Sequence, residues 1–336
     1  MIAFFGTPEF AAVHLAGLLD AGLPVGLVVT RPDRPRVRGR VAEPSPARAL
    51  AAARGIETLA PERARDAGFV ETLRRRGADL FLVVAYGGIL SREALAVPRL
   101  GAVNLHASLL PRWRGAAPIA WAMLAGDART GVTSFFLVEE VDAGDVILAR
   151  ETPIGPAETA GDLAARLSIM GRDVLVETAR LVLEGRAPRA PQDARGVTLA
   201  PRLSKEDGWI PWDRTADEIA RFARAMTPWP GARGIFRGEA ATLLAGEAIP
   251  GGAEPGRVVL PGKETLAIGT GAGLLRVAKI KMPGRRAVSG EEFVRGARPV
   301  DGEAFESPGE SASRVLEQAA AWSAEPKIDQ PRGGLP

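Results

Sequence analysis

Asn104 and His106 are the side chains of this sequence best suited to polar catalysis. They lie two positions apart in the segment NLHASLLPRWRG, at the end of the apolar run 102–105. Alternate side chains of a strand point to the same side, so both are expected at the carboxyl end of one buried strand. There an amide or an imidazole can stabilise an oxyanion, and the imidazole can transfer a proton. A turn-forming asparagine and a surface histidine are the alternative, but the position after a buried strand of an α/β sheet favours catalysis.

The segment VEEVDAGDVI, at 138–147, can supply a carboxylate to the same place. Asp142 and Asp145 flank a turn, and these residue types are also what a plain loop between two strands requires. A carboxylate beside His106 would orient the imidazole and favour its protonated form. We assign this role to Asp142 and expect Asp145 to make structural hydrogen bonds.

The composition excludes several other chemistries. The chain has 336 residues, 46% of them hydrophobic, with no cysteine and two histidines. Without cysteine there can be no disulfide, thiolate zinc site, iron–sulfur cluster or cysteine nucleophile, and two histidines leave little for a metal site. The second histidine, His14, lies on an apolar helical stretch, where a packed structural role is expected. We therefore expect no metal.

The elements that must position Asn104 and His106 follow an α/β order. Apolar runs alternate with helix-like stretches, which predicts right-handed crossovers and a doubly wound, Rossmann-like, mostly parallel sheet. Such sheets bind ligands beyond the carboxyl ends of their strands. The predicted strands are 2–5, 25–30, 79–85, 102–105, 133–138 and 146–152, and the predicted helices are 10–20, 46–54, 64–76 and 159–184.

The chain changes character after this region. Residues 188–203 are rich in proline and arginine, and we expect a linker there, following a first domain over 1–187. Five short strand-like pieces between 233 and 280, separated by Gly and Pro, predict a small OB-like β-barrel in a second domain over 204–301. The polar segment 302–336 is expected to be a flexible tail.

Two stretches concentrate the basic residues, although the net charge is only +3. The Pro-rich loop 31–43 carries five arginines, and a solvated loop is the plain alternative for such a run. Between 256 and 300, nine basic residues stand against three acidic ones. A small barrel with a basic face is a common platform for nucleic acid and acts through phosphates.

Six segments, in order along the chain, resemble the methionyl-tRNA formyltransferase family. The likeness extends to about residue 300, and its NLHxSLLP and DxGD patterns are shared more widely among enzymes that use 10-formyltetrahydrofolate. The GTPEF start, the RPDRP loop, the WRGAAPI extension and the second domain narrow the acceptor. The segments are FFGTPEFA, VVTRPDRP, AYGGIL, NLHASLLPRWRGAAPI, VDAGDVI and SKEDGWIPW.

The resemblance implies catalytic roles for Asn104, His106 and Asp142. It implies a folate site formed by Ser108, Leu109, Leu110 and Pro111 together with Tyr86, Gly87, Gly88, Ile89 and Leu90. It also implies a tRNA surface formed by Arg34, Arg36, Arg38 and Arg40 of the loop and by Arg276, Lys279, Lys281, Arg285 and Arg286 of the second domain. The Gly-Gly pair of the folate segment departs from the family's more usual glycine plus a larger residue. Trp113 could either stack on the terminal adenosine or line the folate pocket.

The implied reaction transfers the formyl group of 10-formyltetrahydrofolate to the α-amino group of methionine on initiator methionyl-tRNA. We expect a monomeric, cytoplasmic enzyme, because MIAFFGTPEF lacks the pattern of a signal peptide and no run of about eighteen apolar residues occurs. A formyltransferase for a small amine or a formyltetrahydrofolate hydrolase is the nearest alternative, and the basic stretches argue against it. A non-catalytic tRNA-binding protein with the same fold is the other alternative.

Overall fold

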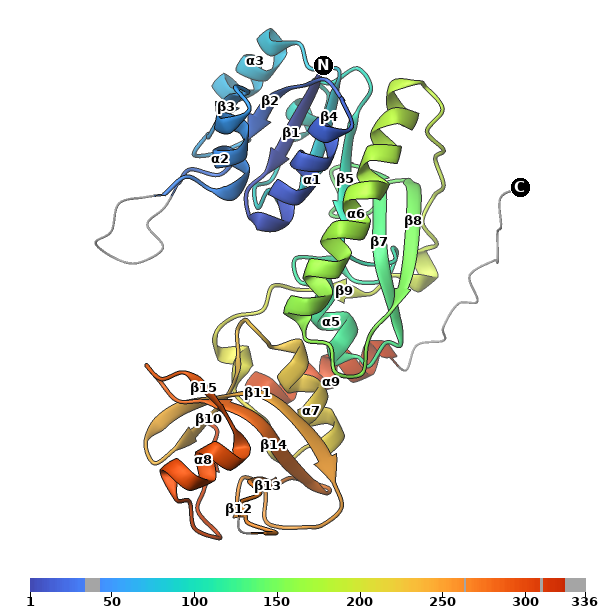
Figure 1. The fold of residues 1–336 in the computed structure, drawn as a ribbon. Coiled ribbons are helices and arrows are strands. Elements are labelled where there is room, and N and C mark those ends of the chain that lie inside the picture. Colours follow the sequence, from blue (N-terminus) through green and yellow to red (C-terminus); the bar gives the residue numbers. More distant parts are fainter. Residues whose placement is uncertain (34–42, 263, 309–310, 324–336) are drawn as a thin grey trace. The chain divides into compact units, whose positions relative to one another are not determined.

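The protein divides into two compact units that are not contiguous in sequence. A computed structural model describes residues 1–33, 43–262, 264–308 and 311–323 (Figure 1). The first unit contains Met1–Gly115, Arg129–Pro153 and Ala164–Leu199, and the second contains Ala116–Ala128, Ile154–Leu163 and the chain from Ala200 onwards. The predicted boundaries at 187 and 203 take the chain to leave its first domain once, whereas in the structure two short excursions into the second unit come earlier.

The first unit is built on a seven-stranded sheet with the order β3-β2-β1-β4-β5-β7-β8. Its first five strands are parallel, and β7 and β8 are antiparallel to their neighbours. The mostly parallel, Rossmann-like sheet expected from the sequence is therefore confirmed. The strands are β1 (Ile2–Gly6), β2 (Val25–Val29), β3 (Glu57–Leu59), β4 (Leu80–Val84), β5 (Ala102–His106), β7 (Arg129–Phe136) and β8 (Val146–Pro153).

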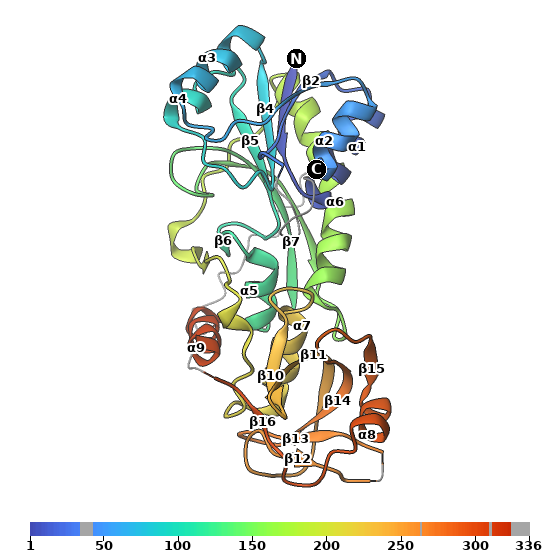
Figure 2. The same ribbon diagram turned by 90° about the vertical axis from the view of Figure 1, so that its left-hand side faces the viewer.

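Helices cover both faces of this sheet, as its composition requires. Strands β1 and β4 are buried along their whole length, which matches their unbroken apolar sequences. Figure 2 shows α1, α2 and α6 on one face and α3 and α4 on the other. The helices are α1 (Glu9–Asp20), α2 (Pro46–Ala53), α3 (Ala67–Arg76), α4 (Arg92–Leu95) and α6 (Ala160–Leu183).

The second unit holds an antiparallel sheet with the order β12-β13-β14-β11-β10-β16, and β15 pairs with β14. An isolated antiparallel bridge joins Arg257, beside β12, to Ala304, beside β16, and hydrogen bonds link Val258 to Glu303 and Phe305 to Gly256. These bonds connect the two ends of the strand order, as a small barrel requires. The strands are β10 (Ala232–Phe236), β11 (Glu239–Ile249), β12 (Val258–Val259), β13 (Ala267–Gly269), β14 (Leu274–Lys281), β15 (Ala287–Ser289) and β16 (Phe305–Glu306).

Three helices pack within the second unit. Helix α7 (Ala216–Ala225) begins at a capping box formed by Thr215 and Glu218, and α5 (Pro118–Leu124) lies against it. Helix α8 (Gly290–Ala297) also begins at a capping box. The sequence SGEE displays the S-x-x-E pattern of such a box, so α8 could have been anticipated although periodicity did not predict it.

Part of the segment expected to be a flexible tail belongs to the second unit. Strand β16 pairs with β10, and Phe305 stacks on Phe236 with ring centroids 4.8 Å apart. Helix α9 (Ser311–Ser323) packs Trp322 against Trp121 at 5.4 Å. Buried aromatic side chains therefore anchor this segment as far as the structure describes it. Over the described ranges, no helix is both long and apolar enough to cross a bilayer.

Candidate active site

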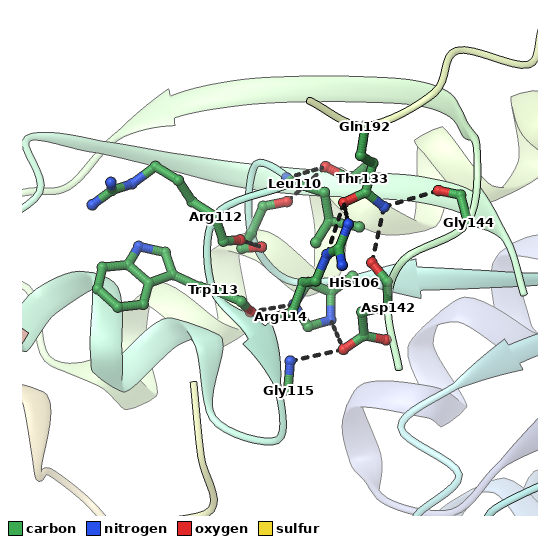
Figure 3. A network of polar contacts seen from close by, with 11 residues as sticks. His106, Leu110, Arg112, Trp113, Arg114, Gly115, Thr133, Asp142, Gly144 and Gln192 are labelled. Atoms are coloured by element: carbon green, nitrogen blue, oxygen red, sulfur yellow. Dashed lines mark hydrogen bonds and ion pairs between the residues drawn. The ribbon is translucent and has the colours of Figure 1, made fainter. Parts of the chain in front are cut away.

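His106 lies at the last position of β5 and is only 6% exposed. Its Nε2 atom is 2.7 Å from the carbonyl oxygen of Trp113, and its Nδ1 atom is 3.6 Å from the Oδ2 atom of Asp142 (Figure 3). A carbonyl oxygen only accepts hydrogen bonds, so Nε2 must carry a proton and donate it to Trp113. Nδ1 is thus the ring nitrogen at which a proton can be gained or lost, and it faces a carboxylate.

Asp142 reaches His106 from the loop between β7 and β8. Its Oδ2 atom accepts a hydrogen bond of 2.8 Å from the backbone N–H of Gly115, and the residue is 9% exposed. Its φ of 51° is in the left-handed region, which costs free energy for any residue other than glycine and is frequent at functional sites. The structure therefore brings together the predicted His106 and Asp142, with the carboxylate oriented by a backbone donor.

Asn104 precedes His106 by two positions on β5, so its side chain lies on the same side of the sheet. It is half-buried, and its amide makes no hydrogen bond to the described residues. An amide held near a histidine and without a partner of its own can donate to a ligand oxygen.

The turn after β5 uses most of its own polar groups internally. The hydroxyl of Ser108 donates to the carbonyl of Arg112 at 2.6 Å. The hydroxyl of Thr133, on β7, donates to the carbonyl of Ser108 at 2.7 Å and accepts from the N–H of Leu110 at 3.2 Å. Ser108 and Leu110 are buried, whereas Leu109 and Pro111 are half-buried. Thr133, which the sequence did not single out, thus fixes the shape of this turn.

The segment Tyr86 to Leu90 follows β4, the neighbour of β5. Tyr86 is buried, its ring lies edge-on to Phe5, and its hydroxyl has no partner among the described residues. Burial raises the pKa of this phenol, so Tyr86 stays protonated. The Tyr86 ring also occupies the place beside Gly88: a Cβ there would lie 2.6 Å from its Cε1 atom. Ile89, in contrast, is 81% exposed and Gly87 has open space around it.

Thr7, in the GTPEF segment, connects this loop to the next one along the sheet edge. Its hydroxyl donates to the carbonyl of Tyr86 and accepts from the N–H of Arg31, both at 3.1 Å. Asp33 accepts from the N–H of Ser45 at 2.9 Å and pairs with Arg48. The two residues that flank the Arg-rich loop are therefore fixed. Arg34, Arg36, Arg38 and Arg40 themselves lie outside the described residues.

The predicted basic residues of the second unit divide into two groups. Arg276 pairs with Glu247 at 2.6 Å, and Arg286 pairs with Glu292 at 3.0 Å. Lys279, Lys281 and Arg285 are exposed and form no ion pair with any residue that the structure describes. The second group therefore presents unneutralised positive charge.

Sequence reasoning missed two side chains that surround the His–Asp pair. Arg114 is part of the motif after His106, but its side chain had no assigned role. Gln192 lies in the segment expected to be a linker, and it contacts both Arg114 and the Asp142 loop. No local sequence signal indicates these contacts. Trp113 is 1% exposed, so the structure does not present it for stacking on a nucleotide. Over the described ranges, no cluster of three histidine, aspartate or glutamate side chains could hold a metal ion.

Comparison with known proteins assigns both parts of the chain. Residues 1–179 match the formyl transferase family, and residues 202–298 match the formyl transferase C-terminal domain. An N-formyltransferase from Helicobacter canadensis has a similar fold, with a TM-score of 0.60 and 16% identity over 82% of this chain and 97% of its own. HypX from Aquifex aeolicus, solved with tetrahydrofolic acid, has a TM-score of 0.56 and 18% identity over 91% of this chain and 50% of its own.

Curated relatives are more similar in sequence. The methionyl-tRNA formyltransferase of Symbiobacterium thermophilum is 45% identical over 91% of this chain and 95% of its own length. The methionyl-tRNA formyltransferase of Pelotomaculum thermopropionicum is 41% identical over 90% of this chain and 97% of its own. Identity at this level over nearly the whole of both chains includes the two matched regions. This chain therefore belongs to the methionyl-tRNA formyltransferase family.

Proposed function

We propose that this protein transfers the formyl group of 10-formyltetrahydrofolate to the α-amino group of methionine on initiator methionyl-tRNA. The observation that carries the proposal is the buried His106–Asp142 pair, with Asn104 on the same strand, in a chain of this family. The product is N-formylmethionyl-tRNA, which serves the initiation of translation.

The chemistry asks for a few groups that this site can supply. The amine nitrogen, in its neutral form, forms a bond to the formyl carbon, and the bond from that carbon to N10 of the folate breaks. Negative charge develops on the formyl oxygen, and the amide of Asn104 is placed to donate to it. The amine loses one proton and N10 gains one, and His106 exchanges that proton at Nδ1 because Nε2 is bound to Trp113.

Asp142 serves the same step from the other side of the ring. A protonated Nδ1 would face the Oδ2 atom of Asp142 at 3.6 Å, so the carboxylate favours the imidazolium form of His106. The N–H of Gly115 holds that oxygen in place. The mechanism requires no metal and no covalent intermediate on the protein.

The folate is proposed to bind along two loops at the sheet edge. Gly87 and Ile89 present open backbone and an exposed apolar side chain, both suited to a flat heterocycle. Tyr86, Gly88 and Leu90 complete that loop, and Ser108, Leu109, Leu110 and Pro111 form the other. Because the Ser108 hydroxyl and the Leu110 N–H are used inside the turn, we assign these two residues to shaping the site.

The tRNA is proposed to bind through basic side chains of both units. Lys279, Lys281 and Arg285 carry unpaired charge for phosphates, and Arg276 and Arg286 extend that group. Arg34, Arg36, Arg38 and Arg40 are proposed for the acceptor stem. Phosphate contacts carry little sequence information, so selection of the initiator tRNA is proposed to depend on the acceptor end.

We further propose that the enzyme acts as a monomer in the cytoplasm, within a domain organisation of residues 1–187, 188–203, 204–301 and 302–336. Sedimentation of the purified chain at assay concentration measures the oligomeric state directly.

One assay tests the main proposal. Purified protein is mixed with 10-formyltetrahydrofolate and methionyl-initiator tRNA, and N-formylmethionine is quantified after deacylation of the tRNA. We expect rapid transfer to initiator tRNA and little to methionyl-elongator tRNA. Equal transfer to both, or none, would overturn the proposal, and release of formate without an acceptor would support the hydrolase instead.

A further inference from the structure

A single amide side chain, that of Gln192, links the two loops that hold the His106–Asp142 pair. Its Nε2 atom donates to the carbonyl of Asp142 at 2.9 Å and to the carbonyl of Gly144 at 2.8 Å. Its Oε1 atom accepts from the Nε and Nη2 atoms of Arg114 at 3.1 and 2.9 Å. Carbonyls only accept and a guanidinium only donates, so the orientation of the Gln192 amide is unambiguous.

The Asp142 loop needs such support because little else holds it. Glu139, Glu140 and Val141 are exposed, so the residues before Asp142 contribute no buried side chain. Asp142 itself has a left-handed backbone. The two bonds from Gln192 hold the main chain on either side of the turn, which fixes the origin of the Asp142 side chain.

Arg114 extends the same link to the other loop (Figure 3). Its neighbours in sequence are Trp113, whose carbonyl accepts from His106, and Gly115, whose N–H donates to Asp142. The side chain of Arg114 is 10% exposed, and its third contact is with Glu140 at 3.0 Å. Both partners of the His–Asp pair are therefore attached to one network that closes through Gln192.

We infer that Gln192 is a positioning residue for the reaction: it holds the Asp142 carboxylate at the distance from His106 that formyl transfer requires. The inference rests on the proposed function. It gives the segment predicted as a linker a direct part in the site. Gln192 contacts neither the reacting atoms nor His106, so its effect must pass through Asp142.

The substitution Gln192→Glu is the sharpest test, because it keeps the shape but replaces the two donors by an acceptor. We expect kcat to fall roughly 10- to 100-fold, since a displacement of about 1 Å can cost about 100-fold. We expect the KM values for folate and tRNA to stay within about twofold, because the binding surfaces are unchanged. Gln318→Glu, the same chemical change on α9, serves as the control and should leave kcat unchanged.

A double-mutant cycle separates positioning from a general structural role. In an Asp142→Ala background there is no carboxylate to hold, so adding Gln192→Glu should lower kcat no further. An equal fold-loss in both backgrounds would overturn the inference. If Gln192→Glu does not give a folded protein by circular dichroism, Gln192→Asn, which keeps the amide but cannot span both loops, takes its place in the same cycle.

The two proposals fail in different ways. If the wild-type protein forms no N-formylmethionyl-tRNA, the proposed function is wrong whatever the variants do. If the wild type is active and Gln192→Glu has the same kcat, the proposed function stands and the role of Gln192 is wrong.

Discussion

In the first unit, His106 is 6% exposed and both of its ring nitrogens face oxygen atoms of the protein. In the second unit, Lys279, Lys281 and Arg285 are exposed and have no ion-pair partner among the described residues. The first group is held by at least two layers of hydrogen bonds, from Trp113 and Asp142 outward to Gln192 and Thr133. The second group stands on β14 and on the turn that follows it.

This difference reflects the distance over which each group must act. Proton transfer and oxyanion stabilisation fail when atoms move by about 1 Å, so the groups that perform them must be fixed by their neighbours. Attraction of a polyanion extends over a Debye length of about 8 Å at physiological salt, so it needs net charge and not a fixed geometry. A carboxylate partner, which orients His106, would instead neutralise a lysine meant for phosphate.

The largest expected effect tests the fixed group. His106→Asn removes the ring nitrogen that exchanges the proton while keeping a small polar side chain, and kcat for formyl transfer should fall about 1,000-fold. The KM for tRNA should stay within about twofold, because the basic residues are untouched. Steady-state kinetics with initiator methionyl-tRNA measures both values. A loss smaller than about tenfold would mean that His106 is not the proton-transfer group.

The other histidine shows what burial does without a complete set of partners. His14 is fully buried between α1 and its surroundings, its Nδ1 atom is 2.6 Å from the carbonyl of Phe10, and its Nε2 atom has no partner among the described residues. Burial, with a smaller contribution from Arg172, lowers its pKa to about 4, although the bond to Phe10 opposes the shift.

Below pH 6.5 the unfolded chain therefore binds a proton at His14 that the folded chain does not bind until about pH 4. The free energy of unfolding should fall across this window by roughly 3 kcal/mol from this residue alone, with no further loss below it. His14→Leu should flatten the wild-type slope between pH 6.5 and 4.5, as measured by urea unfolding at each pH. Parallel curves for the two proteins would contradict the assignment.

The smallest expected effect tests the unfixed group. Lys279→Gln with Lys281→Gln removes two unpaired charges, so the KM for tRNA should rise roughly tenfold and the salt dependence of binding should weaken by one to two contacts, about one unit of slope each. The kcat value and the KM for folate should not change.

Arg276→Gln with Arg286→Gln is the matched control for this pair, because it removes the same charge from side chains already bound to Glu247 and Glu292. We expect a smaller rise in KM, of about twofold. If the two double variants behave alike, overall charge alone governs tRNA binding, and the distinction between paired and unpaired cations has no functional meaning.

Local sequence was sufficient for most of the fold. The unbroken apolar runs became β1, β2, β4 and β5, and helical periodicity located α1, α2, α3, α6 and α7. Elements without such a pattern were missed: β3 has three residues, none of them buried, and α8 is marked only by its capping box. Periodicity reports burial on one face, so short or half-exposed elements leave little trace in it.

The sequence by itself determined which residues carry the chemistry, because Asn104, His106 and Asp142 stand in patterns whose residue types suit proton transfer and whose positions follow buried strands. Only the tertiary structure decided how they act. It assigned Nε2 of His106 to Trp113 and left Nδ1 for Asp142, brought Gln192 from 50 positions away to hold the Asp142 loop, and paired Arg276 but not Lys279. The physical reason is range: strand and turn propensities act between neighbours in sequence, whereas these hydrogen bonds and ion pairs join segments that become neighbours only once the sheet has formed.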